Sequence, residues 1–357
     1  MTIFSRLSIR KSDHSLPHRE GGGWIFSSWK AGGGAFPRGG WEAVFFSILL
    51  LASCSGSDNT LTAEEQARRD SAALHVAVMP VHDCLPLYWA EHIGIFDSLD
   101  VDIRLHTLQA QLDIDTALSN RRVMMGYSDL IRAIMLWQSD TCSTLAIAAT
   151  TGDLDLITPR RGRIRTMAQL RERMVAVARH SITDYWSDRL TDTAAMERDA
   201  IFRPQINDVH IRTAMLINGT MDAAFLPEPY ASQMAVLGAK RHLSTRGLSP
   251  HLAAFIIKQE ASRDTARMEQ IRRCLQAYDT AARRLNDIDH DSLSTLLRDV
   301  CHLPDTLIDT IARCLPPFDA LTPPRKSDAD EALRWIRERG RLRQDLAVDS
   351  LITDIAR

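Results

Sequence analysis

From residue 74 onward, short apolar segments alternate with segments of helical pattern, and this alternation constrains the fold more than any other feature. The pattern predicts strands over 74–79, 101–105, 123–127 and 144–149, and helices over 86–92, 113–120 and 130–137. Strands separated by helices of this length pair in parallel, because each connection crosses over the sheet. The sequence therefore predicts an α/β fold.

A second unit of the same kind is predicted to begin near Pro159. It has strands over 174–178 and 221–226, and a later strand over 253–257 returns the chain to the first unit. The rest, from residue 264, has a helical pattern interrupted by proline pairs. We expect two lobes, each a mostly parallel sheet flanked by helices, with residues 74–158 and 249–357 in lobe 1 and 159–248 in lobe 2. The helical C-terminal region is expected to pack on lobe 1.

The N-terminal region contains an apolar run over 43–54 that ends in Leu51-Ala52-Ser53-Cys54. It is about half as long as a bilayer-spanning helix and is typical of the apolar part of a signal peptide. The four residues resemble a bacterial lipobox, which implies cleavage before Cys54 and acylation of Cys54. Residues 1–54 would be a leader and 55–73 a tether, and the mature chain would be lipid-anchored at a bacterial membrane, in the periplasm or at the cell surface. The alternative is a short buried strand that ends in a free cysteine.

Composition excludes several classes of function. The 43 Lys and Arg residues nearly balance 45 Asp and Glu residues, so no broad basic field indicates a nucleic-acid partner. The cysteines show no CxxC or Cys/His spacing, and no metal site is expected. In an oxidising compartment disulfides are permitted, and Cys301 with Cys314 is the preferred pair.

Three sequence blocks resemble periplasmic substrate-binding proteins of ABC importers, in the nitrate, sulfonate, taurine and thiamine-precursor branch. They are residues 78–96, with the pattern A-x-x-x-G-x-F, residues 123–129, and residues 218–230, with N-G-x-x-D-A-x-x-x-x-E-P. The resemblance implies a two-lobed periplasmic binding protein (type 2) fold that closes on a small molecule by hinge motion. It also implies an ABC permease and its ATPase as partners, a monomer and no cofactor.

Enzymes of the menaquinone and thiamine pathways use the same fold, so an enzyme is one alternative and a sensory lipoprotein another. The histidines of this chain are scattered, and neither a nucleophile elbow nor a glycine-rich phosphate loop follows any predicted strand. The sequence therefore favours a binding protein over an enzyme.

Candidate ligand-binding residues follow the strands, because ligands of open α/β sheets lie at the carboxyl ends of strands. In lobe 1 they are His82, Asp83, Cys84, Gln111, Asp113, Ser128 and Asp129, and in lobe 2 they are His180, Ser181, Thr183, Tyr185, Glu228 and Tyr230. For Asp83, Asp113, Ser128 and Asp129 the alternative is a role at a helix N-terminus, and for Glu228 it is a structural carboxylate.

The predicted site is rich in acids. Asp83, Asp113, Asp129, Asp184 and Glu228 outnumber the single nearby arginine, Arg132. Because like charges destabilise a desolvated anion, this excess disfavours nitrate or a sulfonate. It favours a heterocyclic amine, such as a thiamine-precursor-like pyrimidine.

Overall fold

The computed structural model describes residues 62–139, 142–343 and 346–353. The leader and the lipobox at Cys54 lie outside the described residues. The end of the predicted tether forms helix α1 (Ala63–Ala72), which begins at Thr62, whose hydroxyl accepts a hydrogen bond from the Glu65 N–H at 3.2 Å. In the described part of the chain, no helix has both the length and the apolar character needed to cross a membrane.

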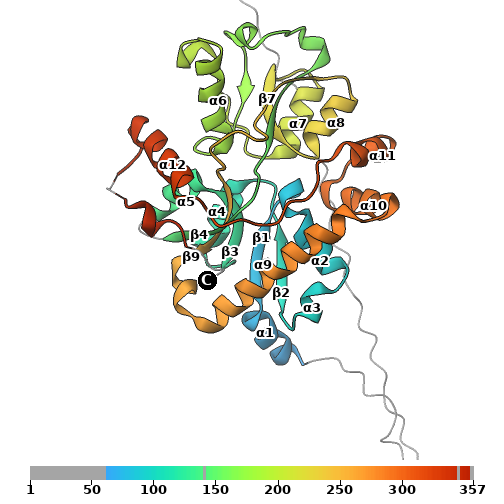
Figure 1. Ribbon diagram of the computed structural model, residues 1–357, viewed down its shortest axis with the longest axis vertical. Coiled ribbons are helices and arrows are strands. Elements are labelled where there is room, and N and C mark those ends of the chain that lie inside the picture. The colour runs from blue at the N-terminus through green and yellow to red at the C-terminus, as the bar shows by residue number, and fades with distance from the viewer. Residues whose placement is uncertain (1–61, 140–141, 344–345, 354–357) are drawn as a thin grey trace, which may run out of the picture. The chain divides into compact units, whose positions relative to one another are not determined.

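The first sheet has five strands in the order β2-β1-β3-β9-β4 (Figure 1). β1 pairs in parallel with both β2 and β3, while β9 is antiparallel to its neighbours β3 and β4, so it alone opposes the other strands of this sheet. This confirms the mostly parallel sheet. The chain returns to it from the second sheet through β9, the one reversed strand. The strands are β1 (Leu74–Val78), β2 (Ile103–Thr107), β3 (Met125–Asp129), β4 (Thr144–Ala149) and β9 (Ala253–Lys258).

The second sheet has four strands in the order β6-β7-β5-β8. β5 is antiparallel to both β7 and β8, and β6 is parallel to β7. β5 belongs to this sheet although it precedes residue 159, so the sheet begins before the predicted lobe border. The strands are β5 (Leu154–Thr158), β6 (Val175–Ala176), β7 (Ala223–Pro227) and β8 (Lys240–Ser244).

Helices connect the strands in both halves, and polar side chains set where several of them begin. Asp129 accepts a hydrogen bond from the Arg132 N–H at the start of α5, and Asp208 accepts one from the Ile211 N–H at the start of α7. The connecting helices are α2 (Leu85–His92), α3 (Ile95–Ser98), α4 (Gln111–Ser119), α5 (Leu130–Trp137), α6 (Ile182–Thr193), α7 (Val209–Ile217) and α8 (Tyr230–Val236).

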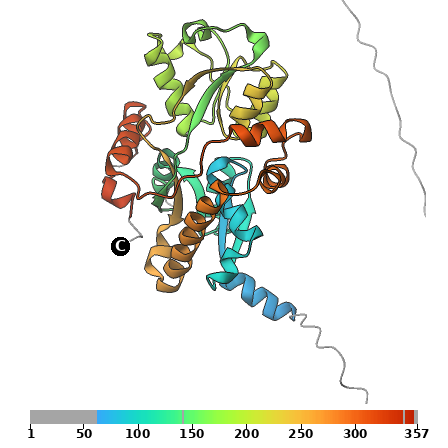
Figure 2. The same ribbon diagram turned by 45° about the vertical axis from the view of Figure 1, so that its right-hand side comes forward.

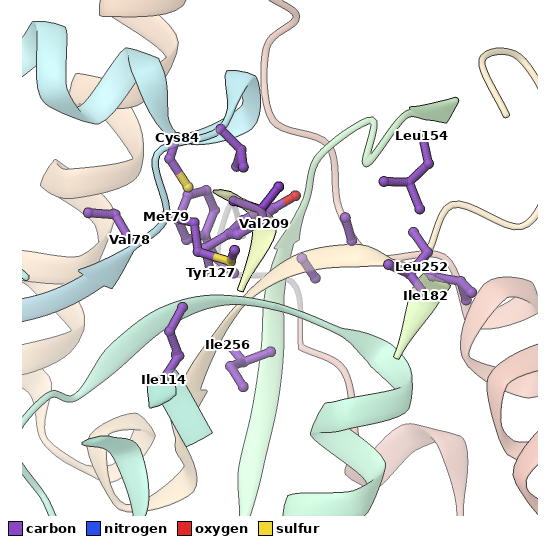
Figure 3. Packing of buried hydrophobic residues seen from close by; sticks show 14 of the residues in the cluster. Val78, Met79, Cys84, Ile114, Tyr127, Leu154, Ile182, Val209, Leu252 and Ile256 are labelled. Atoms are coloured by element: carbon purple, nitrogen blue, oxygen red, sulfur yellow. The ribbon is translucent and has the colours of Figure 1, made fainter. Parts of the chain in front are cut away.

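Buried apolar side chains from both sheets belong to one contiguous cluster. Figure 3 shows part of it, with Val78 and Tyr127 from the first sheet and Leu154 and Val209 from the second half. Burial of this apolar surface is the main favourable contribution to folding. The two sheets are therefore joined by packing as well as by the chain.

The C-terminal helices contact both halves, so the expectation that this region packs on lobe 1 is wrong in part. α9 packs against α2, and α12 packs against α5, both beside the first sheet, whereas α11 packs against α8 beside the second. Figures 1 and 2 both show α11 and α12 on opposite flanks of the described unit. These helices are α9 (Thr265–Asn286), α10 (His290–Cys301), α11 (Asp305–Cys314) and α12 (Lys326–Glu338).

The predicted disulfide between Cys301 and Cys314 is wrong, because both cysteines are free. Cys301 is fully buried, and its thiol lies 3.4 Å from the carbonyl oxygen of Pro80. Cys314 is exposed at the end of α11. The two residues lie on different helices and face different environments.

Two chain segments cross between the sheets and lie against each other: the first crossing segment is residues 150–153, between β4 and β5, and the second is residues 245–252, between β8 and β9. Gly152, between β4 and β5, has φ +59°, and a Cβ added there would lie 2.3 Å from the Cβ of Ala253 at the start of β9. The N–H of Thr150 donates to the carbonyl oxygen of Ala253 at 3.1 Å. Glycine is required at 152 both for the left-handed backbone and for this close approach.

Gly152→Ala is expected to destabilise the protein by about 2–4 kcal/mol, since it adds steric overlap to left-handed strain. Gly219→Ala is the matched control, because Gly219 also has a positive φ, +72°, but an added Cβ would meet nothing within 4 Å. We expect the control to lose only about 1 kcal/mol. Urea unfolding measures both, and equal losses in the two variants would contradict the close-packing explanation.

Candidate functional site

A cavity of about 240 Å³ lies where the strand ends and loops of both sheets meet. Its walls come from the loop after β1, from β3 and the start of α4, from both crossing segments, from α6 and α7, from the end of β7 and from the segment after α11. This position agrees with the rule that ligands of α/β sheets bind beyond the carboxyl ends of strands. The lining residues are Met79, Val81, His82, Asp83, Gln111, Tyr127, Thr151, Gly152, Asp153, Leu154, Ile182, Thr183, Arg212, Pro227, Glu228, Arg246, Gly247, His251, Ala253, Pro316, Pro317 and Asp319.

Among the residues predicted from sequence, the structure places His82, Asp83, Gln111, Thr183 and Glu228 on the cavity wall. They come from both halves of the chain, as the prediction required. Whether each of them binds a ligand stays a prediction.

Asp83 is occupied by groups of its own chain. Its carboxylate accepts hydrogen bonds from the Tyr127 hydroxyl at 2.9 Å, the Thr150 hydroxyl at 2.6 Å and the Gly152 N–H at 2.9 Å. Burial by itself would raise the pKa of Asp83, but the nearby His82 and these hydrogen bonds outweigh it and lower the pKa below its usual value. Asp83 is therefore a charged structural group that links the loop after β1 to the crossing segment.

Two other carboxylates of the wall are also paired. Glu228 accepts a hydrogen bond from the Ser232 N–H at 2.9 Å and forms an ion pair with Arg241 at 3.2 Å. Burial raises the pKa of Glu228, and the Ser232 N–H partly offsets this effect. Asp153 forms an ion pair with Arg246 at 3.1 Å.

His82 joins the cavity to the C-terminal part of the chain. Its ring stacks on Phe318 with centroids 4.3 Å apart and planes 6° from parallel. Its Nε2 lies 3.1 Å from the carbonyl oxygen of Pro316, which can only accept, so Nε2 carries the proton. The segment after α11 thus forms part of the cavity wall because His82 holds it there.

Asp129 does not reach the cavity, and it caps two helices instead. One carboxylate oxygen accepts from the Arg132 N–H of α5 at 2.9 Å, and the other accepts from the Ile182 N–H of α6 at 3.1 Å. Arg132 is buried and pairs with Asp115. Burial raises the pKa of Asp115 to about 6, although the charge of Arg132 acts to lower it. Asp129 therefore occupies the N-terminus of α6, where a ligand anion would otherwise find unpaired N–H groups.

The remaining predicted residues lie off the cavity wall. The Ser181 side chain accepts from the Thr183 N–H at the start of α6, and the Tyr185 hydroxyl donates to Glu331 at 2.9 Å. The Tyr230 hydroxyl donates to the carbonyl oxygen of Pro80 at 2.8 Å. Cys84 and Ser128 are fully buried, Asp113 is exposed on α4, and His180 is partly buried beside the start of α6.

Two arginines of the wall were missed by sequence reasoning. Arg246 lies in the second crossing segment, and Arg212 lies within α7 at 4 % exposure. Among the described residues, the Nε and Nη1 atoms of Arg212 have no hydrogen-bond partner, and burial lowers its pKa to about 10. The local sequence does not show that an arginine inside a helix lines a cavity, because its burial depends on packing against the other half of the chain.

The cavity holds only part of the acidic set expected from sequence. Asp113, Asp129 and Asp184 lie outside its wall, which has four carboxylates, Asp83, Asp153, Glu228 and Asp319, and two arginines, Arg212 and Arg246. Within the described residues, no group of three or more His, Cys, Asp and Glu side chains could hold a metal ion.

Asp83→Asn is expected to cost about 2–4 kcal/mol of unfolding free energy at pH 7, because the amide replaces an acceptor by a donor among buried donors. The lowered pKa of Asp83 means that its contribution is complete above about pH 4 and is lost as the pH falls below that value. The difference between wild type and Asp83→Asn should therefore shrink on acidification, as measured by urea unfolding at several pH values. Asp113→Asn, at an exposed site, should differ little from wild type, and a pH-independent gap for Asp83→Asn would contradict the charged state.

Comparison with known proteins places the fold. No protein-family model matches the sequence, and no curated protein matches it. Solved structures do match. The alkanesulfonate-binding protein SsuA from Xanthomonas axonopodis pv. citri, bound to MOPS, has a TM-score of 0.67 at 16% identity over 79% of this chain and 98% of that one. The periplasmic nitrate-binding protein NrtA from Synechocystis PCC 6803 has a TM-score of 0.66 at 12% identity over 79% and 86%.

One similar structure is an enzyme. The desulfurization enzyme DSZB matches with a TM-score of 0.55 at 15% identity over 79% of this chain and 96% of that one. Identities this low establish the fold and leave the activity to the site. The chain has the two-lobed α/β fold of periplasmic binding proteins, which confirms the fold expected from sequence.

Proposed function

We propose that this chain is the solute-binding component of an ABC import system, which holds a small molecule in the cavity between the two sheets and delivers it to a permease. The cavity carries this proposal, because both halves of the chain contribute to one space beyond their strand ends. Structures of binding proteins with the same fold support it. ATP would be hydrolysed by the partner ATPase, and the chain would act as a monomer without a cofactor.

The enzyme alternative finds little support at the cavity. Cys84 lies near the loop after β1 but is fully buried and off the cavity wall. Burial raises the pKa of its thiol well above the usual value, which opposes the thiolate that a nucleophile needs. The ring of His82 is held by Pro316 and Phe318.

The preference for a thiamine-precursor-like pyrimidine or another heterocyclic amine is weakened. It depended on free carboxylates, whereas Asp83, Asp153 and Glu228 are each paired with donors of the chain and Asp319 is exposed to solvent. The ligand class has to be argued from the groups that stay unpaired.

Lipid anchoring through Cys54 belongs to the same proposal. An anchored binding protein stays close to its permease, which raises its effective concentration there. The support is the lipobox-like sequence and the apolar run before it. The mature chain would then be lipid-anchored at a bacterial membrane, in the periplasm or at the cell surface.

A bulky side chain at the cavity should displace the ligand. Pro317→Trp adds an indole at an exposed position of the cavity wall, and Pro323→Trp makes the same change at an exposed position outside it. We expect wild type and Pro323→Trp to release one small molecule on denaturation and Pro317→Trp to release at least about tenfold less, because the indole fills much of so small a cavity. Mass spectrometry of the released material measures this. Equal amounts from both variants would place the ligand elsewhere, and no ligand in any sample together with no melting shift by any solute would refute the binding function.

Cys54→Ser should leave the protein unprocessed and without acyl chains. Wild type is expected to partition into the detergent phase and to have a mass that corresponds to cleavage before residue 54 plus lipid. Intact-mass measurement and detergent partitioning test this prediction. A wild-type mass without lipid would contradict it.

A further inference from the structure

Arg212 carries a buried charge at the cavity that has no ion pair among the described residues. Its Nε and Nη1 atoms also have no hydrogen-bond partner there. Its side chain is 4 % exposed and lines the cavity. A buried guanidinium is costly unless an anion or several acceptors compensate it. Asp208, an acid whose charge acts on Arg212, uses its carboxylate to accept from the Ile211 N–H at the start of α7.

The other charged groups of the wall are matched within the chain, apart from Asp319, which is exposed to solvent. Arg246 pairs with Asp153. Glu228 pairs with Arg241, and Asp83 accepts several hydrogen bonds. Among the described residues of the wall, the buried charge without a partner is therefore the positive charge of Arg212.

We propose that Arg212 anchors the solute through a single oxyanion group, a carboxylate or a sulfonate, so that the ligand is a small organic monoanion. This inference rests on the proposed binding function. The planar guanidinium can donate two parallel hydrogen bonds to such a group, and the buried setting strengthens them. One unmatched cation balances one negative charge, which disfavours inorganic phosphate.

The rest of the ligand faces a largely apolar surface. Met79, Val81, Leu154, Ile182 and Pro316 contribute to the wall. A short alkyl or aromatic portion would bury its surface against these side chains. The volume of about 240 Å³ limits that portion to a small size.

The test compares wild type with Arg212→Met and Arg212→Lys, and uses Arg284→Met, at an exposed position of α9, as a matched control. The probes are butane-1-sulfonate, benzoate, inorganic phosphate and 4-aminopyrimidine, measured by titration calorimetry and thermal melting. We expect wild type and the control to bind the sulfonate or the carboxylate, Arg212→Met to bind it about 100-fold more weakly, and Arg212→Lys to recover part of the loss. The sulfonate and carboxylate arms identify which oxyanion is preferred.

Ligand-free Arg212→Met gives a second and independent readout. Because methionine removes an uncompensated buried charge, this variant should melt about 2–4 °C higher than ligand-free wild type. A lower melting temperature would show that Arg212 is satisfied within the chain and would overturn the proposal.

The remaining outcomes separate the inference from the function on which it rests. Equal oxyanion binding by wild type and Arg212→Met, or binding of 4-aminopyrimidine or phosphate alone, overturns the role of Arg212 and leaves the binding function standing. If no probe binds, the compound that co-purifies with wild type decides. An organic monoanion absent from Arg212→Met supports the inference, any other compound overturns it, and no compound at all refutes the binding function together with the inference.

Discussion

The buried carboxylate of Asp83 is the interaction on which the site depends most. It connects the loop after β1 to Tyr127 of β3 and to Thr150 and Gly152, where the chain leaves the first sheet for the second. Because these donors hold it charged in the interior, a single group fixes the end of one strand, the face of another and the start of the crossing segment. The cavity lies against this junction, and its shape therefore follows from an interaction that involves no ligand.

A second set of contacts joins the two halves at the flank. The indole N–H of Trp335 on α12 donates to Asp188 of α6 at 2.8 Å, and Arg339 pairs with Asp184 and Asp188. α12 also packs against α5, beside the first sheet. Any separation of the two sheets must therefore break either the polar contacts between α12 and α6 or the packing of α12 against α5, in addition to the capping of α6 by Asp129. The C-terminal helices thus take part in positioning the cavity, although their sequence pattern indicates only amphipathic helices.

The fold was largely predictable from sequence, and the exceptions have physical reasons. Buried strands such as Ala253–Lys258 are continuous apolar runs, which sequence patterns detect well. β8 (Lys240–Ser244) was missed because it is a polar, largely exposed edge strand, and β5 (Leu154–Thr158) because it follows the crossing segment without a helix between. For the site, the strand-end rule located the loops correctly. It did not distinguish side chains that face the cavity, such as Thr183, from neighbours such as Ser181 that satisfy the backbone.

The charge of the site shows why counting residue types is insufficient. An acidic residue at a strand end can cap a helix, as Asp129 does, or accept donors from a crossing segment, as Asp83 does. Once so used, its charge is no longer available to a solute, because its lone pairs are already occupied. A buried charged group that lacks such partners within the chain behaves differently. The free-energy cost of its burial is offset only when a ligand supplies the missing partners. The unmatched groups of a cavity therefore carry more information about its ligand than the sum of its charges, and in this chain the clearest of them is Arg212.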